Sequence, residues 1–213
     1  MESHHIRCAG SPCVCAFIVE REAEIERYWK QSRVAVLIFL VEIIGGLLSH
    51  GFSVISDSLH VFVDFAFYLT GVKVAKDELR ALAPQPHSRQ IGAYSHGFVF
   101  FPVATLIAFH AIERLQGEQG IAPTPLIYST ILGLLGNIWQ VKIAGKVHNI
   151  TEKGVWFHNI TDCLASAVAL IAGLAIFFGV TSAVDGWASL GIAVIMFWSG
   201  ATIIYQARNG HHH

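Results

Sequence analysis

Long apolar segments dominate this sequence and are separated by short polar ones. A helix needs about 20 apolar residues to cross the hydrocarbon core of a bilayer, and only helices and closed barrels satisfy their backbone there. Charged residues make up only 14% of the 213, against about a quarter in an average soluble domain. We therefore predict an all-α membrane protein with six transmembrane helices. The expected spans are residues 34–52, 54 to beyond 71, 98–112, 126–145, 155–180 and 187–205.

Positive charge is distributed unevenly between these segments. All but Arg114 of the 14 Lys and Arg residues flank the spans on one side of the membrane. Cytoplasmic segments carry the excess of Lys and Arg, so both termini are expected in the cytoplasm. The net charge of −1 provides no field that would attract nucleic acid. The expected surrounding is the lipid bilayer, because the apolar segments are long enough to cross it.

Three parts are expected along the chain. Residues 1–32 form a cytoplasmic arm with a surface helix, residues 33–208 form the six-helix membrane domain, and residues 209–213 are a purification-tag remnant.

Two of the apolar segments carry the same polar motif. His60 and Asp64 lie four residues apart in the second segment, as do His158 and Asp162 in the fifth. Side chains at this spacing share one face of a helix. A carboxylate near the bilayer centre costs about 2.5–3.5 kcal/mol on insertion scales, so one that is tolerated there needs a partner. Two such pairs on two helices predict a four-ligand cation site.

The ligand chemistry favours zinc, which binds imidazole and carboxylate in tetrahedral geometry at about 2.0–2.2 Å. The pairs offer no thiolate or thioether for copper(I), and imidazole argues against magnesium and calcium. Imidazole titrates near pH ~6.5, so protons and metal compete for the same nitrogens. The pattern predicts an antiporter that exchanges protons for Zn²⁺, with the ion as transported substrate, and it predicts no enzyme activity.

Three further polar residues are candidates for the access path or the surroundings of the site, namely Asp57, Glu42 and Asn137. Asp57 lies within about 60° of the His60 and Asp64 face. Glu42, a carboxylate within the first span, either relays protons or bonds to Asn137 or Gln140 of the fourth.

Other positions favour packing or solvation over chemistry. Ala165, Ala169 and Gly173 continue the line of the second pair, and such small residues predict that the second helix packs against them. His87 and His96 lie in or beside a polar segment without a neighbouring carboxylate, so we expect them to be solvated.

The two pairs resemble the second and fifth transmembrane helices of the cation diffusion facilitator family of zinc transporters. SDSLHVFVD is similar to that family's ADAGHMLTD type of segment, and FHNITDCLAS to its LHVLGDALAS type. The matching positions are Asp57, His60, Asp64, His158, Asp162 and Ser166, and AIERL, Asn137 and Asp185 also fit.

The resemblance implies zinc export from the cytoplasm coupled to proton entry, usually by a homodimer, here in a bacterial inner membrane. Two features depart from the family pattern. Its members usually continue into a cytoplasmic metal-sensing domain after the sixth helix, whereas this sequence ends soon after Arg208. The charged residues that usually enter the third helix are replaced by apolar ones in YSHGFVFF.

Several alternatives are compatible with the same residues. The pairs could be hydrogen bonds that hold helices together, or the transported ion could be Co²⁺, Cd²⁺, Fe²⁺ or Mn²⁺. A b-type haem protein would use His60 and His158 as axial ligands. An intramembrane metalloenzyme is a further alternative, although the sequence contains no HExxH motif.

Overall fold

The computed structural model describes residues 12–117, 120–145 and 150–209. Each of six helices in this part of the chain is long and apolar enough to cross a membrane, which confirms the predicted six-helix, all-α fold class. The expected tag remnant lies outside the described residues except for residue 209. The helices are α1 (Pro12–Ser49), α2 (Phe52–Ala81), α3 (Pro86–Leu115), α4 (Pro123–Ala144), α5 (Ile150–Phe177) and α6 (Ala183–Asn209).

Several helices extend beyond their apolar segments, α1 and α3 among them. The expected surface helix of the N-terminal arm is the first part of α1, which continues without a break into the first span. The third helix begins at Pro86, 12 residues before the expected start at Phe98. Proline is favoured in the first turn of a helix, where its missing N–H removes no hydrogen bond. Residues 86–90, which lie before the expected third span, therefore form the first turn of α3.

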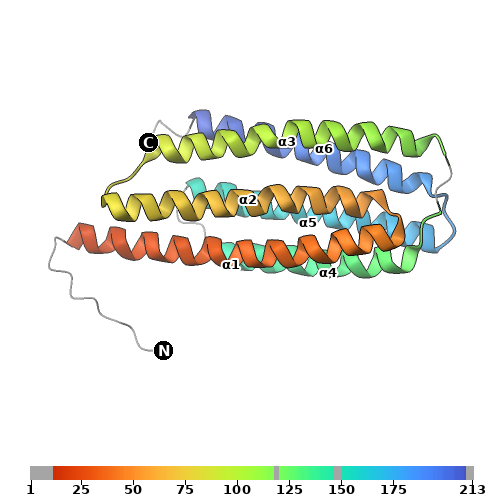
Figure 1. Ribbon diagram of the computed structural model, residues 1–213, viewed down its shortest axis with the longest axis horizontal. Coiled ribbons are helices and arrows are strands. Elements are labelled where there is room, and N and C mark those ends of the chain that lie inside the picture. Colours follow the sequence, from red (N-terminus) through yellow and green to blue (C-terminus); the bar gives the residue numbers. More distant parts are fainter. Residues whose placement is uncertain (1–11, 118–119, 146–149, 210–213) are drawn as a thin grey trace, which may run out of the picture.

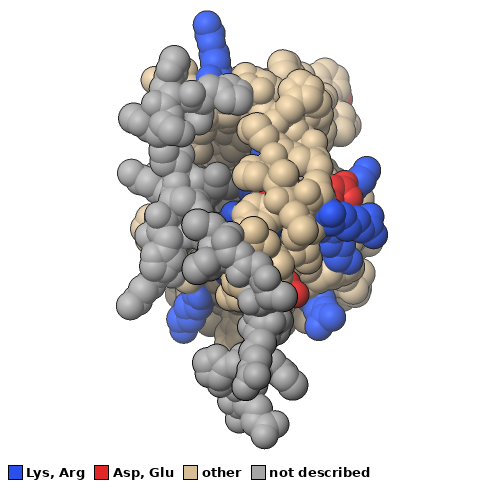
Figure 2. Space-filling view, turned by 90° about the vertical axis from the view of Figure 1, so that its left-hand side faces the viewer, with Lys and Arg blue, Asp and Glu red and all other residues tan. Residues whose placement is uncertain are grey.

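The helices form three layers, with α3 and α6 in one, α2 and α5 in the middle, and α1 and α4 in the third (Figure 1). The described ends of the chain, at α1 and α6, lie at the same end of the bundle, together with the turn between α2 and α3. Figure 2 looks onto this end, where Lys and Arg side chains lie around the rim. We call it the basic end, and its assignment to the cytoplasm stays a prediction.

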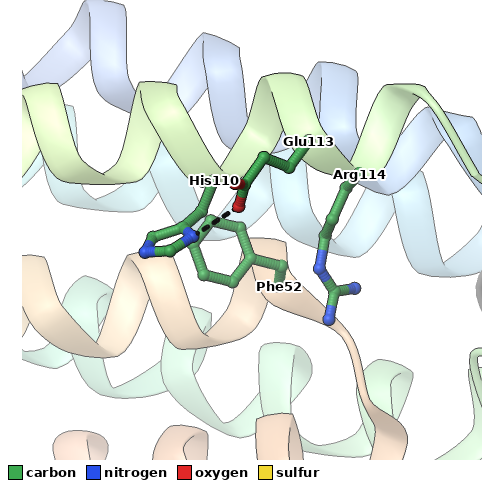
Figure 3. A pocket seen from close by; sticks show the side chains of 4 residues that line it. All are labelled: Phe52, His110, Glu113 and Arg114. Atoms are coloured by element: carbon green, nitrogen blue, oxygen red, sulfur yellow. Dashed lines mark hydrogen bonds and ion pairs between the residues drawn. The ribbon is translucent and has the colours of Figure 1, made fainter.

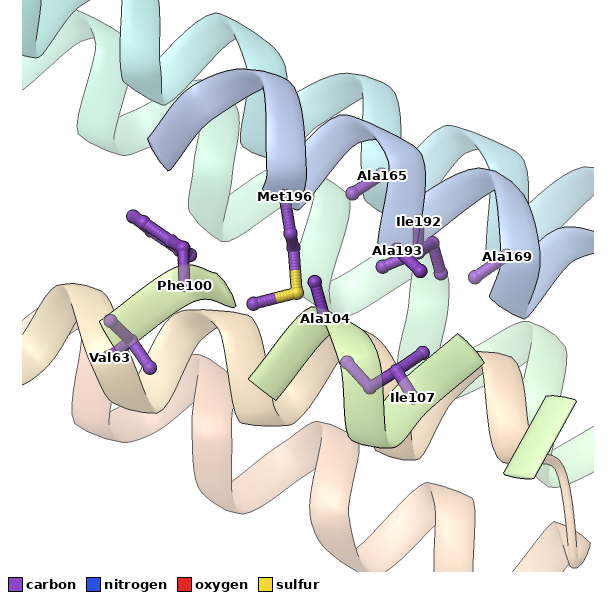
Figure 4. Packing of buried hydrophobic residues seen from close by; sticks show 9 residues of the cluster. All are labelled: Val63, Phe100, Ala104, Ile107, Ala165, Ala169, Ile192, Ala193 and Met196. Carbon is purple, nitrogen blue, oxygen red and sulfur yellow. The ribbon is translucent and has the colours of Figure 1, made fainter. Parts of the chain in front are cut away.

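A core of apolar side chains joins the outer α3–α6 layer to the middle layer (Figure 4). Ala165 and Ala169 of α5 are fully buried in this core. The line of small residues on α5 was expected to face α2, but α2 supplies only Val63 among the buried members, and Gly173 faces Leu126 of α4. The buried members are Val63, Phe100, Ala104, Ile107, Ala165, Ala169, Ile192, Ala193 and Met196.

Ion pairs tie three helices together at the basic end. The guanidinium of Arg89 on α3 lies 2.8 Å from Glu24 of α1 and 2.7 Å from Glu78 of α2. Glu78 is buried and also accepts a hydrogen bond from the backbone N–H of Gln85. These bonds hold α1 and α2 to the first turn of α3.

At the opposite end, Asp185 of α6 caps the start of α2. Its carboxylate accepts hydrogen bonds from the backbone N–H groups of Phe52 and Ser53, at 2.7 and 3.0 Å, and lies 3.2 Å from Arg114. A pocket of about 390 Å³ lies beside this cap and is lined by Phe52, His110, Glu113 and Arg114 (Figure 3). The cap supplies acceptors that α2 lacks locally, because Gly51 precedes its first turn.

Candidate metal centre

The two His–Asp pairs meet in the middle layer. Asp64 lies about 18 Å along α2 and Asp162 about 18 Å along α5, at a rise of about 1.5 Å per residue, so both lie near the middle of their helices. One potential ligand atom from each of His60, Asp64, His158 and Asp162 lies within 4.8 Å of the other three, and all four residues are buried. The expected fifth span begins at residue 155, close to the second pair, but α5 begins earlier, at Ile150.

The distances between ligand atoms suit a single ion. Four atoms that bind zinc at about 2.0–2.1 Å in a tetrahedron lie about 3.3–3.4 Å apart. His60 Nε2 lies 3.6 Å from Asp64 Oδ2 and 3.1 Å from Asp162 Oδ1. His158 Nε2 lies 2.7 Å from Asp64 Oδ1 and 3.8 Å from Asp162 Oδ1. The four values bracket the tetrahedral separation, so small side-chain adjustments would bring all four ligands onto one ion.

Hydrogen bonding leaves much of this group unsatisfied. His60 Nε2 and both carboxylate oxygens of Asp162 are buried and make no well-aligned hydrogen bond in the described part of the chain, although His60 Nε2 lies 3.1 Å from Asp162 Oδ1. A buried polar group without a partner is costly, and an unpaired buried charge far more so. One divalent cation would balance the two carboxylates and satisfy the nitrogen and oxygen atoms together.

A chain of hydrogen bonds connects the centre to α4. The amide nitrogen of Asn137 donates to Ser166 Oγ at 2.8 Å, and that hydroxyl donates to Asp57 Oδ2 at 2.6 Å. The same amide lies 3.4 Å from the backbone oxygen of Asp162. Asp57 and Asn137 are thus placed beside the four-residue group, and Ser166 links them.

Glu42 approaches the centre from α1 and is fully buried. Its carboxylate lies against Gly133 of α4, where a Cβ atom would overlap it. Among the described residues, neither of its oxygens has a hydrogen-bond donor, so the expected alternative of a bond to Asn137 or Gln140 is wrong. The carboxylates of Asp57 and Asp162 are near enough to interact electrostatically with the carboxylate of Glu42.

His96 was missed by the sequence analysis, and its expected solvation is wrong. It is 6% exposed, and its Nε2 lies 3.9 Å from Asp64 Oδ1. His96 lies before residue 98, where the expected third span began, so it was not placed on a helix. A signal was present, since His96 precedes the buried residues Phe100, Ala104 and Ile107 at helical spacing and Pro86 marks an earlier helix start.

The sequence comparison agrees with this geometry. The family model for the cation efflux transmembrane domain matches residues 32–209. The chain belongs to the cation efflux family. The resemblance to cation diffusion facilitators is thereby confirmed. This cation efflux protein is a multi-pass membrane protein, and the family to which it belongs is one of transporters and not of enzymes.

Characterised bacterial relatives are distant. The chain is 25% identical to the "Cadmium, cobalt and zinc/H(+)-K(+) antiporter" of Bacillus subtilis, over 77% of its own length and 56% of the relative's. It is 23% identical to "Zinc transporter ZitB" of Pectobacterium atrosepticum, over 82% and 57% of the two chains. The figures for "Zinc transporter ZitB" of Escherichia coli are 24%, 80% and 57%. The chain thus matches little more than half the length of these relatives.

Proposed function

We propose that this cation efflux protein is a zinc/proton antiporter that exports Zn²⁺ from the cytoplasm. The transport site is the tetrahedral group of His60, Asp64, His158 and Asp162. The observation that carries this proposal is the burial of two imidazoles and two carboxylates within 4.8 Å of one another at the middle of two antiparallel helices.

The choice of zinc rests on the donor set and on the relatives. Zinc accepts nitrogen and oxygen ligands in a tetrahedron without a rigid geometric demand. The names of all three relatives described above include zinc. Proton exchange is supported by the name of the Bacillus subtilis protein, which is a zinc/H(+)-K(+) antiporter. Because imidazole must be neutral to bind metal, proton entry from the far side would favour release.

The residues around the site would have supporting roles. Asp57 and Asn137, bridged by Ser166, orient α2, α4 and α5 around the ligands. Glu42 is a buried carboxylate of α1 and is proposed to belong to the path taken by ions or protons.

The surroundings of the protein follow from the charge pattern and the family. With the basic end in the cytoplasm, both termini lie there, and Zn²⁺ leaves towards the end that carries Arg114. A bacterial inner membrane and a homodimer are proposed on the resemblance to the family alone.

A broader divalent-cation transporter is the second candidate, because the Bacillus subtilis relative is named for cadmium and cobalt as well as zinc. Competition of Cd²⁺, Co²⁺, Fe²⁺ and Mn²⁺ with zinc in a flux assay separates the two candidates. The haem alternative is disfavoured because a carboxylate oxygen lies within 3.1 Å of the Nε2 atom of both His60 and His158, where a haem iron would bind.

The deciding experiment measures zinc uptake into proteoliposomes under an imposed pH gradient. The wild type should accumulate Zn²⁺, and dissipating the gradient should stop uptake. Asp162→Asn removes one charge from the site with little change in shape and should abolish the flux. Glu113→Gln, an exposed site at the other end of α3, serves as the control and should transport normally. Zinc flux retained in Asp162→Asn would overturn the site assignment.

A further inference from the structure

His96 lies on α3, outside the pair of helices that supply the four ligands, yet its ring faces them. The ring centroids of His96 and His158 are 5.6 Å apart, and the ring planes are nearly perpendicular. The Nε2 atom is buried and has no hydrogen-bond partner among the described residues. A buried imidazole nitrogen without a partner is costly, so its position calls for a physical reason.

The distance from His96 to the centre is within reach of a shared ion. Two atoms that bind one zinc ion at about 2.0–2.2 Å cannot lie more than about 4.2–4.4 Å apart. The distance of 3.9 Å between His96 Nε2 and Asp64 Oδ1 is inside this limit. These two atoms are therefore close enough to bind one ion. His96 is not among the four residues whose ligand atoms all lie within 4.8 Å of one another, so its ring would have to move towards the other three ligands to complete the bond.

Neighbouring aromatic rings hold the imidazole of His96 in this orientation. It stacks on Phe67 of α2 with ring centroids 4.2 Å apart and planes 24° apart. The ring of Phe100, one turn along α3, contacts it edge-on at 4.8 Å and also contacts His60 and His158. These apolar contacts explain the packing of the ring but provide nothing for the nitrogen that faces Asp64.

We propose that His96 is a fifth ligand of the transported ion, so that α3 adds a third imidazole to the centre formed by α2 and α5. This inference rests on the proposed transport function of the four-residue group. Zinc can expand from four to five ligands, and cobalt and nickel bind imidazole well, whereas manganese favours carboxylate, carbonyl and water ligands. A centre with three imidazoles and two carboxylates therefore selects zinc-like ions over Mn²⁺.

The same bond would couple the layers of the molecule. Because α3 packs mainly on α6, an ion held by His96, Asp64 and His158 joins the α3–α6 layer to the middle layer. Binding of the ion would draw these two layers together at the centre, and release would loosen them.

The test counts imidazole ligands on the bound ion. Full-length protein is loaded with one equivalent of Zn²⁺ and measured by extended X-ray absorption fine structure, and the Zn²⁺ and Mn²⁺ dissociation constants are measured by calorimetry. The variant His96→Phe keeps an aromatic ring against Phe67 and removes both nitrogens. His110→Phe is the matched control, because His110 lies on the same helix, is exposed, and is at the opposite end from the basic end.

Wild type and His110→Phe should show one imidazole more than His96→Phe, and this difference cancels the contribution of histidines elsewhere in the chain. The Zn²⁺ dissociation constant of His96→Phe should rise at least about tenfold, the effect of losing even an outer-shell partner, and its preference for Zn²⁺ over Mn²⁺ should fall. Equal imidazole counts in wild type and His96→Phe, with Zn²⁺ bound in both, would overturn the fifth ligand.

A second variant separates this inference from the proposed function. Asp162→Ala should remove high-affinity binding in the presence or absence of His96. If Asp162→Ala binds Zn²⁺ as the wild type does, the four-residue site itself is wrong. If Asp162→Ala fails to bind Zn²⁺ while His96→Phe binds like wild type, the site stands and only the role of His96 is refuted.

Discussion

Replacement of Asp185 should weaken the contact between the start of α6 and the start of α2. Its carboxylate accepts hydrogen bonds from the backbone N–H groups of Phe52 and Ser53 and from the Ser53 hydroxyl, at 2.7, 3.0 and 2.5 Å. Asp185 is 1% exposed and Ser53 is fully buried, so water cannot replace the lost acceptor easily. Arg114, which also binds Asp185, retains its hydrogen bond to the backbone oxygen of His50.

The expected cost follows from these contacts. Loss of a helix cap costs about 0.5–2 kcal/mol, and a buried donor left without an acceptor costs about 1–3 kcal/mol. For Asp185→Ala we therefore expect a loss of about 3 kcal/mol in the free energy of unfolding. A chain of this length loses about 2–4 °C in Tm per kcal/mol, so Tm should fall by about 6–12 °C in scanning fluorimetry of the purified protein in detergent. Asp185→Asn keeps one acceptor oxygen and should lose about half as much.

The control lies on the same end of the bundle. Glu113 pairs with His110 at 2.9 Å, but both side chains are about half exposed. Exposed pairs contribute about 0–1 kcal/mol, so Glu113→Ala should lower Tm by no more than about 4 °C. If Asp185→Ala lowers Tm by no more than Glu113→Ala does, the carboxylate of Asp185 does not stabilise the start of α2 and the reasoning fails.

Two further predictions concern the other contacts between helices. Replacing Arg89 by Ala leaves Glu24 and the buried Glu78 with Arg21 as a remaining cationic partner. The loss should therefore be about 1–3 kcal/mol in chemical unfolding, less than for a buried carboxylate left without any partner. The exposed Arg80→Ala should change stability by less than about 0.5 kcal/mol. Asn137→Ala breaks the hydrogen bonds behind the metal centre and should weaken zinc binding by about 10–100-fold in calorimetry, whereas unchanged affinity would remove Asn137 from any supporting role.

The location of the metal centre among the layers gives these contacts a common setting. The centre lies between α2 and α5, while the ion pairs of Arg89 lie near one end of α2 and the cap by Asp185 at the other. In both places α2 is held to the α3–α6 layer by charged groups rather than by apolar packing alone. Changes at either end should therefore alter how α2 sits beside the centre.

The local pattern of the sequence was sufficient for the number of helices and for the two pairs, but not for where each helix begins. The length of each apolar segment decides whether it can cross a bilayer. The lengths of these segments and their number can both be counted along a single chain. The four-residue spacing of His60 and Asp64, and of His158 and Asp162, places each pair on one helix face before any fold is known. That two such faces meet was inferred from their chemistry, because buried carboxylates require partners.

Other contacts depend on residues far apart in the chain, and only the tertiary structure decided them. Asp185 caps a helix that begins 133 residues earlier, and Ser166 donates to Asp57 across 109 residues. His96 was missed because it precedes the apolar segment that defined the expected third span, while its neighbours in space are Phe67, Phe100 and the metal centre. Periodicity describes one helix at a time, whereas the rotation and depth of α3 against α2 depend on how all six helices pack.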